Sequence, residues 1–76
     1  MTLHTLQQLI AEIFSVEPNT VTPETSFADE LGADELDLVE LMMAVEEEFD
    51  LPETPKDRVQ QLQTVEDVMS IIEENA

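Results

Sequence analysis

Apolar residues in this chain recur at intervals of three and four, and this spacing is the strongest constraint on its fold. Residues so spaced share one face of an α-helix, whereas a half-buried β-strand would need strict alternation. The first such segment runs from Leu3 to Phe14, with Thr2 as its expected N-cap. Its apolar residues are Leu3, Leu6, Ile10, Ile13 and Phe14. We therefore predict an amphipathic first helix.

The stretch from Val16 to Ala33 is expected to be a long ordered loop. It contains Pro18, Pro23 and the single glycine, Gly32, and such residues oppose a continuous helix. A structureless loop of this length would be unusual in a compact domain. We therefore expect apolar side chains to hold it against the core, namely Val21, Phe27 and Leu31.

A second helix is predicted to start at Asp34, an N-cap residue followed by carboxylates at Glu35 and Asp37 near the positive end of the helix dipole. At about 100° per residue, its side chains divide into two faces. The predicted core face holds Leu38, Leu41, Met42, Val45 and Phe49. The opposite face holds Leu36, Asp37, Glu40, Met43, Ala44 and Glu47 and is free to contact another molecule. Asp50 and Pro52 should end this helix.

Two further helices complete the expected pattern. A short third helix is predicted through Leu62, with Thr54 as cap and Pro55 at its first position. Thr64 and Asp67 resemble a capping box that opens a last helix. Its inward residues should be Val65, Val68, Met69 and Ile72. No segment alternates with a period of two, so we predict an all-α bundle in which residues 1–76 form one domain.

The charge of the chain limits its partners. Of its 76 residues, 19 are Asp or Glu and only two are Lys or Arg, which gives a formal net charge of −17. Such a field repels nucleic acids and anionic membranes and attracts basic protein surfaces. The residues after Met1 include no basic segment followed by a long apolar run, so neither a signal peptide nor a membrane span is predicted. We expect a cytoplasmic protein.

No catalytic or metal-binding residues are predicted. The chain has no cysteine and one histidine, His4, which supports neither a catalytic triad nor a zinc site. Its many carboxylates could act as acids or bases only in a pocket that shifts their pKa, and a small bundle has little room for one. The acidic segment 29–53 lacks the ligand spacing and central glycine of an EF-hand loop.

The segment from Thr25 to Phe49, TSFADELGADELDLVELMMAVEEEF, resembles the central part of an acyl carrier protein. The resemblance extends to Thr64–Val68, Ile10–Ile13 and Val21–Glu24 and so covers nearly the whole chain. It implies a four-helix bundle with three longer helices, a short third helix and a long loop between the first two. In that family a Ser within an Asp-Ser-Leu motif carries 4′-phosphopantetheine, and the acidic second helix docks onto basic patches of partner enzymes.

Matched to that pattern, eight residues are expected to contact partners. They are Asp34, Leu36, Asp37, Glu40, Met43, Ala44, Glu47 and, at the margin, Glu46. The chain departs from the pattern at the attachment position, where Glu35 replaces the Ser. A carboxylate has no hydroxyl with which to form the phosphodiester, and Ser15, Ser26 and Ser70 lie elsewhere in the predicted fold. We therefore expect no attached cofactor.

Three functional hypotheses remain. The first is a monomeric docking module for fatty-acid, polyketide or related biosynthetic enzymes, in which the charge of Glu35 stands loosely where a phosphate would lie. The second is an ordinary carrier protein seen as a serine-less variant, in which Glu35 only stabilises the first turn of the helix. The third is an acidic cation-binding protein with no enzyme partner.

Overall fold

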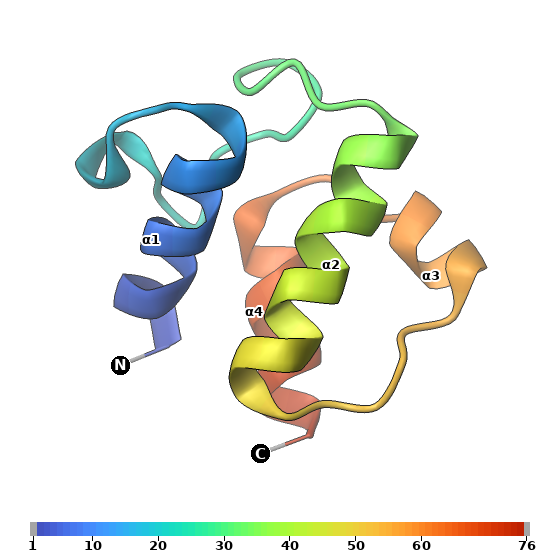
Figure 1. Cartoon of the computed structure of the whole chain (residues 1–76). Helices are drawn as coiled ribbons and strands as arrows, with labels where there is room; N and C mark the ends of the chain where they lie inside the picture. The colour runs from blue at the N-terminus through green and yellow to red at the C-terminus, as the bar shows by residue number, and fades with distance from the viewer. Residues whose placement is uncertain (1, 76) are drawn as a thin grey trace.

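The computed structural model describes residues 2–75, which form helices joined by loops (Figure 1). The elements in chain order are α1 (Thr2–Phe14), the 3₁₀ helix η1 (Pro18–Thr20), α2 (Glu35–Phe49), α3 (Lys56–Gln60) and α4 (Val65–Glu74). Among the described residues the only β-type pairing is an isolated antiparallel bridge between Ser26 and Thr64. The predicted all-α fold, with its long first loop and short third helix, is confirmed. None of the helices in residues 2–75 has both the length and the hydropathy to cross a membrane.

Thr2, which was predicted to be the N-cap, is already a helical residue of α1. Leu6 and Ile10 are fully buried, as the spacing predicted. The helix ends at Phe14, and the next residue, Ser15, adopts a left-handed φ of 57°. The chain then turns back, so that the N–H of Val16 donates to the Ala11 carbonyl at 3.2 Å, one bond of a Schellman-type C-cap.

The loop between α1 and α2 is ordered by the core and by the start of α4. Val21 and Phe27 are buried, as predicted, and Leu31 is half-buried against the core. The loop carbonyls of Pro23 and Thr25 accept hydrogen bonds from the N–H groups of Glu66 and Val65, at 2.9 and 3.0 Å. The first N–H groups of a helix have no acceptor within the helix. The two loop carbonyls therefore supply the acceptors for the start of α4. The short helix η1 inside this loop was not predicted.

Helix α3 starts after Pro55, whereas the sequence predicted Thr54 as cap and Pro55 inside the helix. Pro55 has φ −58° and ψ 145°, so its φ suits a helix but its ψ is extended. It is therefore the N-cap, and its carbonyl accepts the N–H groups of Arg58 and Val59 at 3.0 and 3.1 Å. The helix ends at Gln60, two residues before the predicted end at Leu62.

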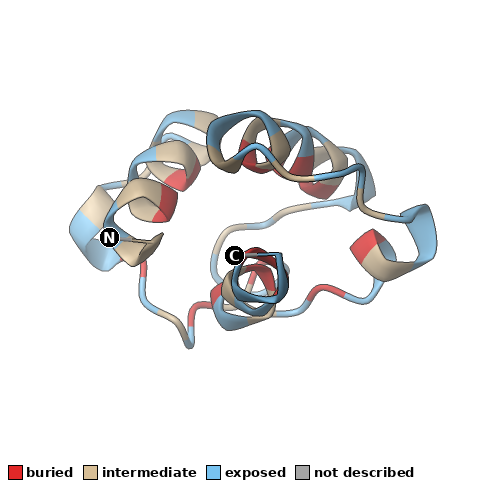
Figure 2. Ribbon diagram, turned by 90° about the horizontal axis from the view of Figure 1, so that it is seen from below, coloured by how far each residue is buried: buried red, intermediate tan, exposed pale blue. Residues whose placement is uncertain are grey.

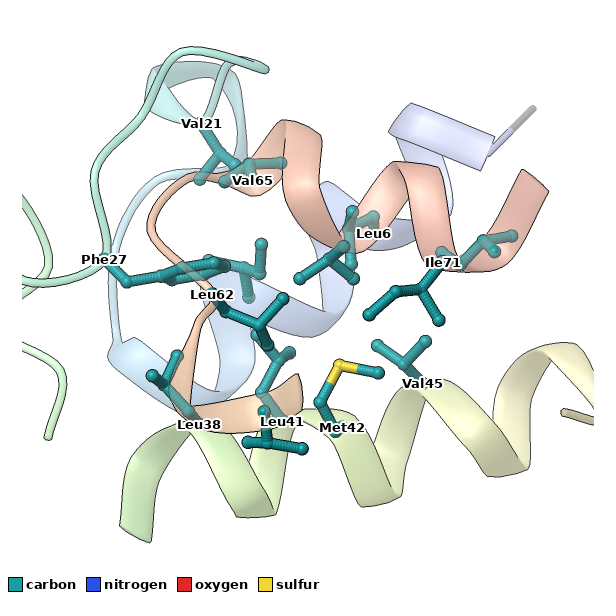
Figure 3. Packing of buried hydrophobic residues seen from close by; sticks show 14 residues of the cluster. Leu6, Val21, Phe27, Leu38, Leu41, Met42, Val45, Leu62, Val65 and Ile71 are labelled. Carbon is teal, nitrogen blue, oxygen red and sulfur yellow. The ribbon is translucent and has the colours of Figure 1, made fainter. Parts of the chain in front are cut away.

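The core lies where the inner faces of the helices meet, and Figure 2 shows the buried positions turned towards the interior of the molecule. In Figure 3, Leu38, Leu41, Met42 and Val45 of α2 point towards Phe27, Leu62 and Ile71. The predicted inward residues Val65, Val68 and Ile72 of α4 are buried, and Met69 is half-buried. Ile71, which the sequence did not single out, is buried as well. This packing leaves the opposite side of α2 in contact with solvent.

Candidate functional site

The start of α2 is fixed by a reciprocal capping box. The carboxylate of Asp34 accepts the N–H of Asp37 at 2.9 Å, and the carboxylate of Asp37 accepts the N–H of Asp34 at 3.1 Å. Gly32 leads into this turn with φ 62°, a conformation in which a side chain would be strained. The predicted cap is therefore confirmed, and it holds the first turn of α2 in a defined position.

Glu35 is the first residue of α2, and its side chain is exposed. Its carboxylate oxygen Oε1 accepts a hydrogen bond from Nε2 of Gln60, the last residue of α3, at 2.9 Å. Glu35 thus does more than occupy the first turn: it links the start of α2 to the end of the neighbouring short helix. Gln60 was not among the predicted site residues, because it lies 25 positions along the chain.

The outward face of α2 combines exposed apolar and acidic side chains. Leu36 is 78% exposed and Met43 is 64% exposed. Glu40 and Glu47 are exposed beside them, while Asp37 and Ala44 are half-buried. We call the set Leu36, Asp37, Glu40, Met43, Ala44 and Glu47 the outward face. Large exposed apolar side chains rimmed by carboxylates suit a basic partner that also offers apolar contacts.

Glu46 differs from the other predicted contact residues. It is half-buried, and its Oε2 accepts the N–H of Thr54 at 2.8 Å, eight residues along the chain. This hydrogen bond holds the connection between α2 and α3, residues 50–55, against α2. Glu46 therefore has a structural role in holding this connection. The sequence had placed it at the margin of the residues expected to contact partners.

The few positive charges of the molecule lie on α3. Lys56 is exposed, whereas the guanidinium of Arg58 makes a bidentate ion pair with Glu74 of α4, with Nη1 to Oε1 at 2.9 Å. Hydrogen bonding to Arg58 lowers the pKa of the Glu74 carboxyl, and the same contact raises the pKa of Arg58. The outward face of α2 contains no basic residue, so its charge is entirely negative.

The side chains present do not fit covalent attachment of phosphopantetheine to α2. No residue from Glu35 to Phe49 carries a hydroxyl. The hydroxyl of Ser26 lies in the long loop, where it accepts the N–H of Asp29 at 3.1 Å, and Ser70 lies on α4. Within residues 2–75, no three carboxylate, imidazole or thiol side chains are grouped to hold a metal ion. His4 is exposed on α1.

A small helical bundle that presents a capped, acidic and partly apolar helix defines a binding or carrier domain. Residues 4–72 match the protein family described as the phosphopantetheine attachment site. The chain is 52% identical over 68 residues to an acyl carrier protein of Bdellovibrio bacteriovorus, an alignment that covers 90% of this chain and 86% of that one. It is 47% identical over 70 residues to an acyl carrier protein of Thermosynechococcus vestitus, covering 92% and 85%.

Solved structures agree with this assignment. A structure assigned to the acyl carrier proteins of Mycobacterium tuberculosis superposes with a TM-score of 0.86 at 26% identity, covering 97% of both chains. The acyl carrier protein of Enterococcus faecalis gives a TM-score of 0.79 at 26% identity, covering 97% of this chain and 92% of that one. The chain therefore belongs to the acyl carrier protein family. Like the other members of this family of non-catalytic carriers, it is not an enzyme.

Proposed function

We propose that this protein is a docking module of the acyl carrier type that is not itself loaded with 4′-phosphopantetheine. The observation that carries the proposal is the carboxylate of Glu35 at the start of α2, in the Asp-x-Leu turn formed by Asp34 and Leu36. Attachment requires a hydroxyl oxygen that displaces the nucleotide part of coenzyme A and forms a phosphodiester. A carboxylate has no hydroxyl for that ester.

The partners of the proposed module are basic surfaces of enzymes that use carrier proteins in fatty-acid, polyketide or related biosynthesis. The outward face supports this assignment, because Glu40 and Glu47 flank the exposed apolar side chains of Leu36 and Met43. Carboxylates steer a basic surface and fix its orientation, while the apolar residues add buried contact area. In this proposal the protein acts as a cytoplasmic monomer that regulates or assembles such enzymes.

The test of docking is a charge reversal on the outward face. Replacing Glu40 and Glu47 together by Lys should abolish capture of carrier-dependent synthase enzymes in a pull-down. The matched control is Glu12→Lys with Glu73→Lys, which makes the same charge change at exposed positions on α1 and α4. Equal capture by the two variants would contradict the assigned face.

A second candidate is an ordinary carrier in which the attachment Ser has been replaced. The acyl carrier proteins at 45–52% identity over most of the chain favour it. Incubation with coenzyme A and a phosphopantetheinyl transferase, followed by intact-mass measurement, tests whether the chain with Glu35 can be modified. The same experiment on a Glu35→Ser variant tests whether a Ser at this position is enough for modification. We expect the chain with Glu35 to remain unmodified and the Glu35→Ser variant to gain one phosphopantetheinyl group. A modified native chain would refute the central proposal, and an unmodified variant would count against this second candidate.

A further inference from the structure

Ser70 is an exposed hydroxyl residue in the second half of α4. Carboxylates follow it three and four residues later, at Glu73 and Glu74, and both are exposed. Protein kinases select substrates partly by the charges around the hydroxyl, and one class of them prefers acidic side chains after it. Ser70 also lies near the C-terminal end of α4, and local opening of a helix end gives a kinase access to such a segment.

Ser70 shares a small surface hollow with Arg58, the single arginine of the chain. The volume of this hollow is about 160 Å³, and its lining residues are Arg58, Gln61, Leu62, Asp67, Ser70 and Ile71. Ser70 and Glu74 are one helical turn apart on α4, so their Cβ atoms are separated by only about 5–6 Å. The guanidinium group that pairs with Glu74 is therefore close to the position of the Ser70 hydroxyl.

A phosphate on Ser70 would be a stronger acceptor for Arg58 than the carboxylate of Glu74. A phosphoserine carries a charge of about −1.5 to −2 at neutral pH and three acceptor oxygens, and a guanidinium group binds two of them at once. The present pair is exposed, with side chains 42% and 52% accessible, and pairs of this kind are weak. Asp67, the carboxylate in the hollow, already accepts the N–H groups of Gln63 and Thr64.

We propose that Ser70 is a phosphorylation site for an acid-directed protein kinase, and that the phosphate takes Arg58 from Glu74. In this modification the Ser70 Oγ forms a bond to the γ-phosphorus of ATP. The bond from that phosphorus to the β,γ-bridging oxygen breaks, ADP leaves, and the hydroxyl proton passes to a base of the kinase. The site lies outside the outward face, so it is independent of the proposed docking function.

The exchange moves the attachment of α3 by one turn of α4. Glu74 is the last residue of α4, and its ion pair with Arg58 ties the helix end to α3. Ser70 lies one turn earlier, next to the core residue Ile71. In the phosphorylated protein α3 stays tied to α4, whereas the last turn of α4 loses its contact. We expect faster amide hydrogen exchange at residues 73–75 and unchanged exchange at residues 65–69.

Incubation with ATP and an acid-directed Ser/Thr kinase, followed by intact-mass measurement, tests the modification. We expect one phosphate on the unaltered chain and none on Ser70→Ala. The matched control is Ser26→Ala, because Ser26 is also followed three residues later by a carboxylate, Asp29. The hydroxyl of Ser26 is half-buried and accepts the N–H of Asp29 at 3.1 Å, so this variant should be modified like the unaltered chain.

NMR of the Arg58 side chain tests the exchange of partners. Because the chain has a single arginine, one Nε–H signal reports on this guanidinium group. Glu74→Gln should shift the signal in the unmodified protein. After phosphorylation the signal should move to a new position, and Glu74→Gln should then leave it nearly unchanged. This variant keeps Glu73, the carboxylate three residues after Ser70, and so remains a kinase substrate.

Several outcomes would overturn the proposal. An unmodified chain would refute Ser70 as a kinase site, and a phosphate on Ser15 or Ser26 would place the modification in the long loop. An Arg58 signal that still responds to Glu74→Gln after phosphorylation would refute the exchange of partners. Loss of helical circular dichroism on phosphorylation would mean that the phosphate breaks α4 and does not pair with Arg58.

Discussion

The side-chain amide of Gln60 donates a hydrogen bond of 2.9 Å to the carboxylate of Glu35, joining the end of α3 to the start of α2. Both residues are exposed, so the bond competes with water. A double-mutant cycle with Glu35→Ala and Gln60→Ala should give a coupling of about 0.5 kcal/mol in the free energy of unfolding, since exposed contacts contribute little. Urea denaturation measures it, and additive single effects would show that the bond has no energetic role.

The capping carboxylate of Asp34 should contribute more to the free energy of unfolding than the bond between Gln60 and Glu35 does. Asp34→Ala removes the acceptor for the Asp37 N–H and should lower the free energy of unfolding by about 1 kcal/mol. Asp34→Asn loses the same charge but keeps a capping oxygen, so it should cost much less. Chemical denaturation of the two variants checks the prediction. Equal destabilisation by Ala and Asn would mean that the charge of Asp34, and not its cap, stabilises α2.

The start of α2 could be predicted from the sequence because its determinants are local. Asp34 and Asp37 are three residues apart, and the apolar spacing after them fixes which face is buried. For the same reason Leu36 and Met43 were correctly expected to be exposed. Residue type and short spacing suffice for such features.

Contacts that depend on tertiary approach could not be predicted in this way. The pairing of Glu35 with Gln60 requires α3 to lie against α2, and nothing in either residue indicates the other. The start of α3 depends on the ψ angle of Pro55. The proline ring fixes φ but not ψ, so the residue type alone does not say whether Pro55 lies inside the helix or caps it. The single turn of η1 is too short to produce a periodic pattern.

Asp50 offers a stabilising substitution at the other end of α2. It closes the helix in a left-handed conformation with φ 56°, and its carboxylate lies at the negative end of the helix dipole. Asp50→Asn keeps a residue that tolerates this conformation and removes the unfavourable charge, so it should raise the free energy of unfolding by about 0.5 kcal/mol. Glu24→Gln, an exposed loop position, is the control for general relief of charge repulsion. An equal rise in the free energy of unfolding for the two variants would mean that general relief of charge repulsion, and not the position of Asp50 at the end of α2, causes the gain.

The ion pair between Arg58 and Glu74 should make stability depend on pH in the acid range. Hydrogen bonding to Arg58 lowers the pKa of Glu74 in the folded protein, so near this pKa the unfolded chain binds more protons than the folded one. The contribution of the pair is therefore complete above the unfolded pKa of about 4.3. It is lost as the pH falls through the lower pKa of the folded state.

A double-mutant cycle isolates that contribution from the repulsion among the other carboxylates. Arg58→Gln and Glu74→Gln, alone and together, should show a favourable coupling at pH 7 that disappears in acid. The coupling should be small and should shrink in salt, because the side chains are 42% and 52% exposed. Thermal denaturation across this pH range measures it. A coupling that persists below the folded pKa of Glu74 would mean that packing between α3 and α4, and not the charge of the carboxylate, links the two residues.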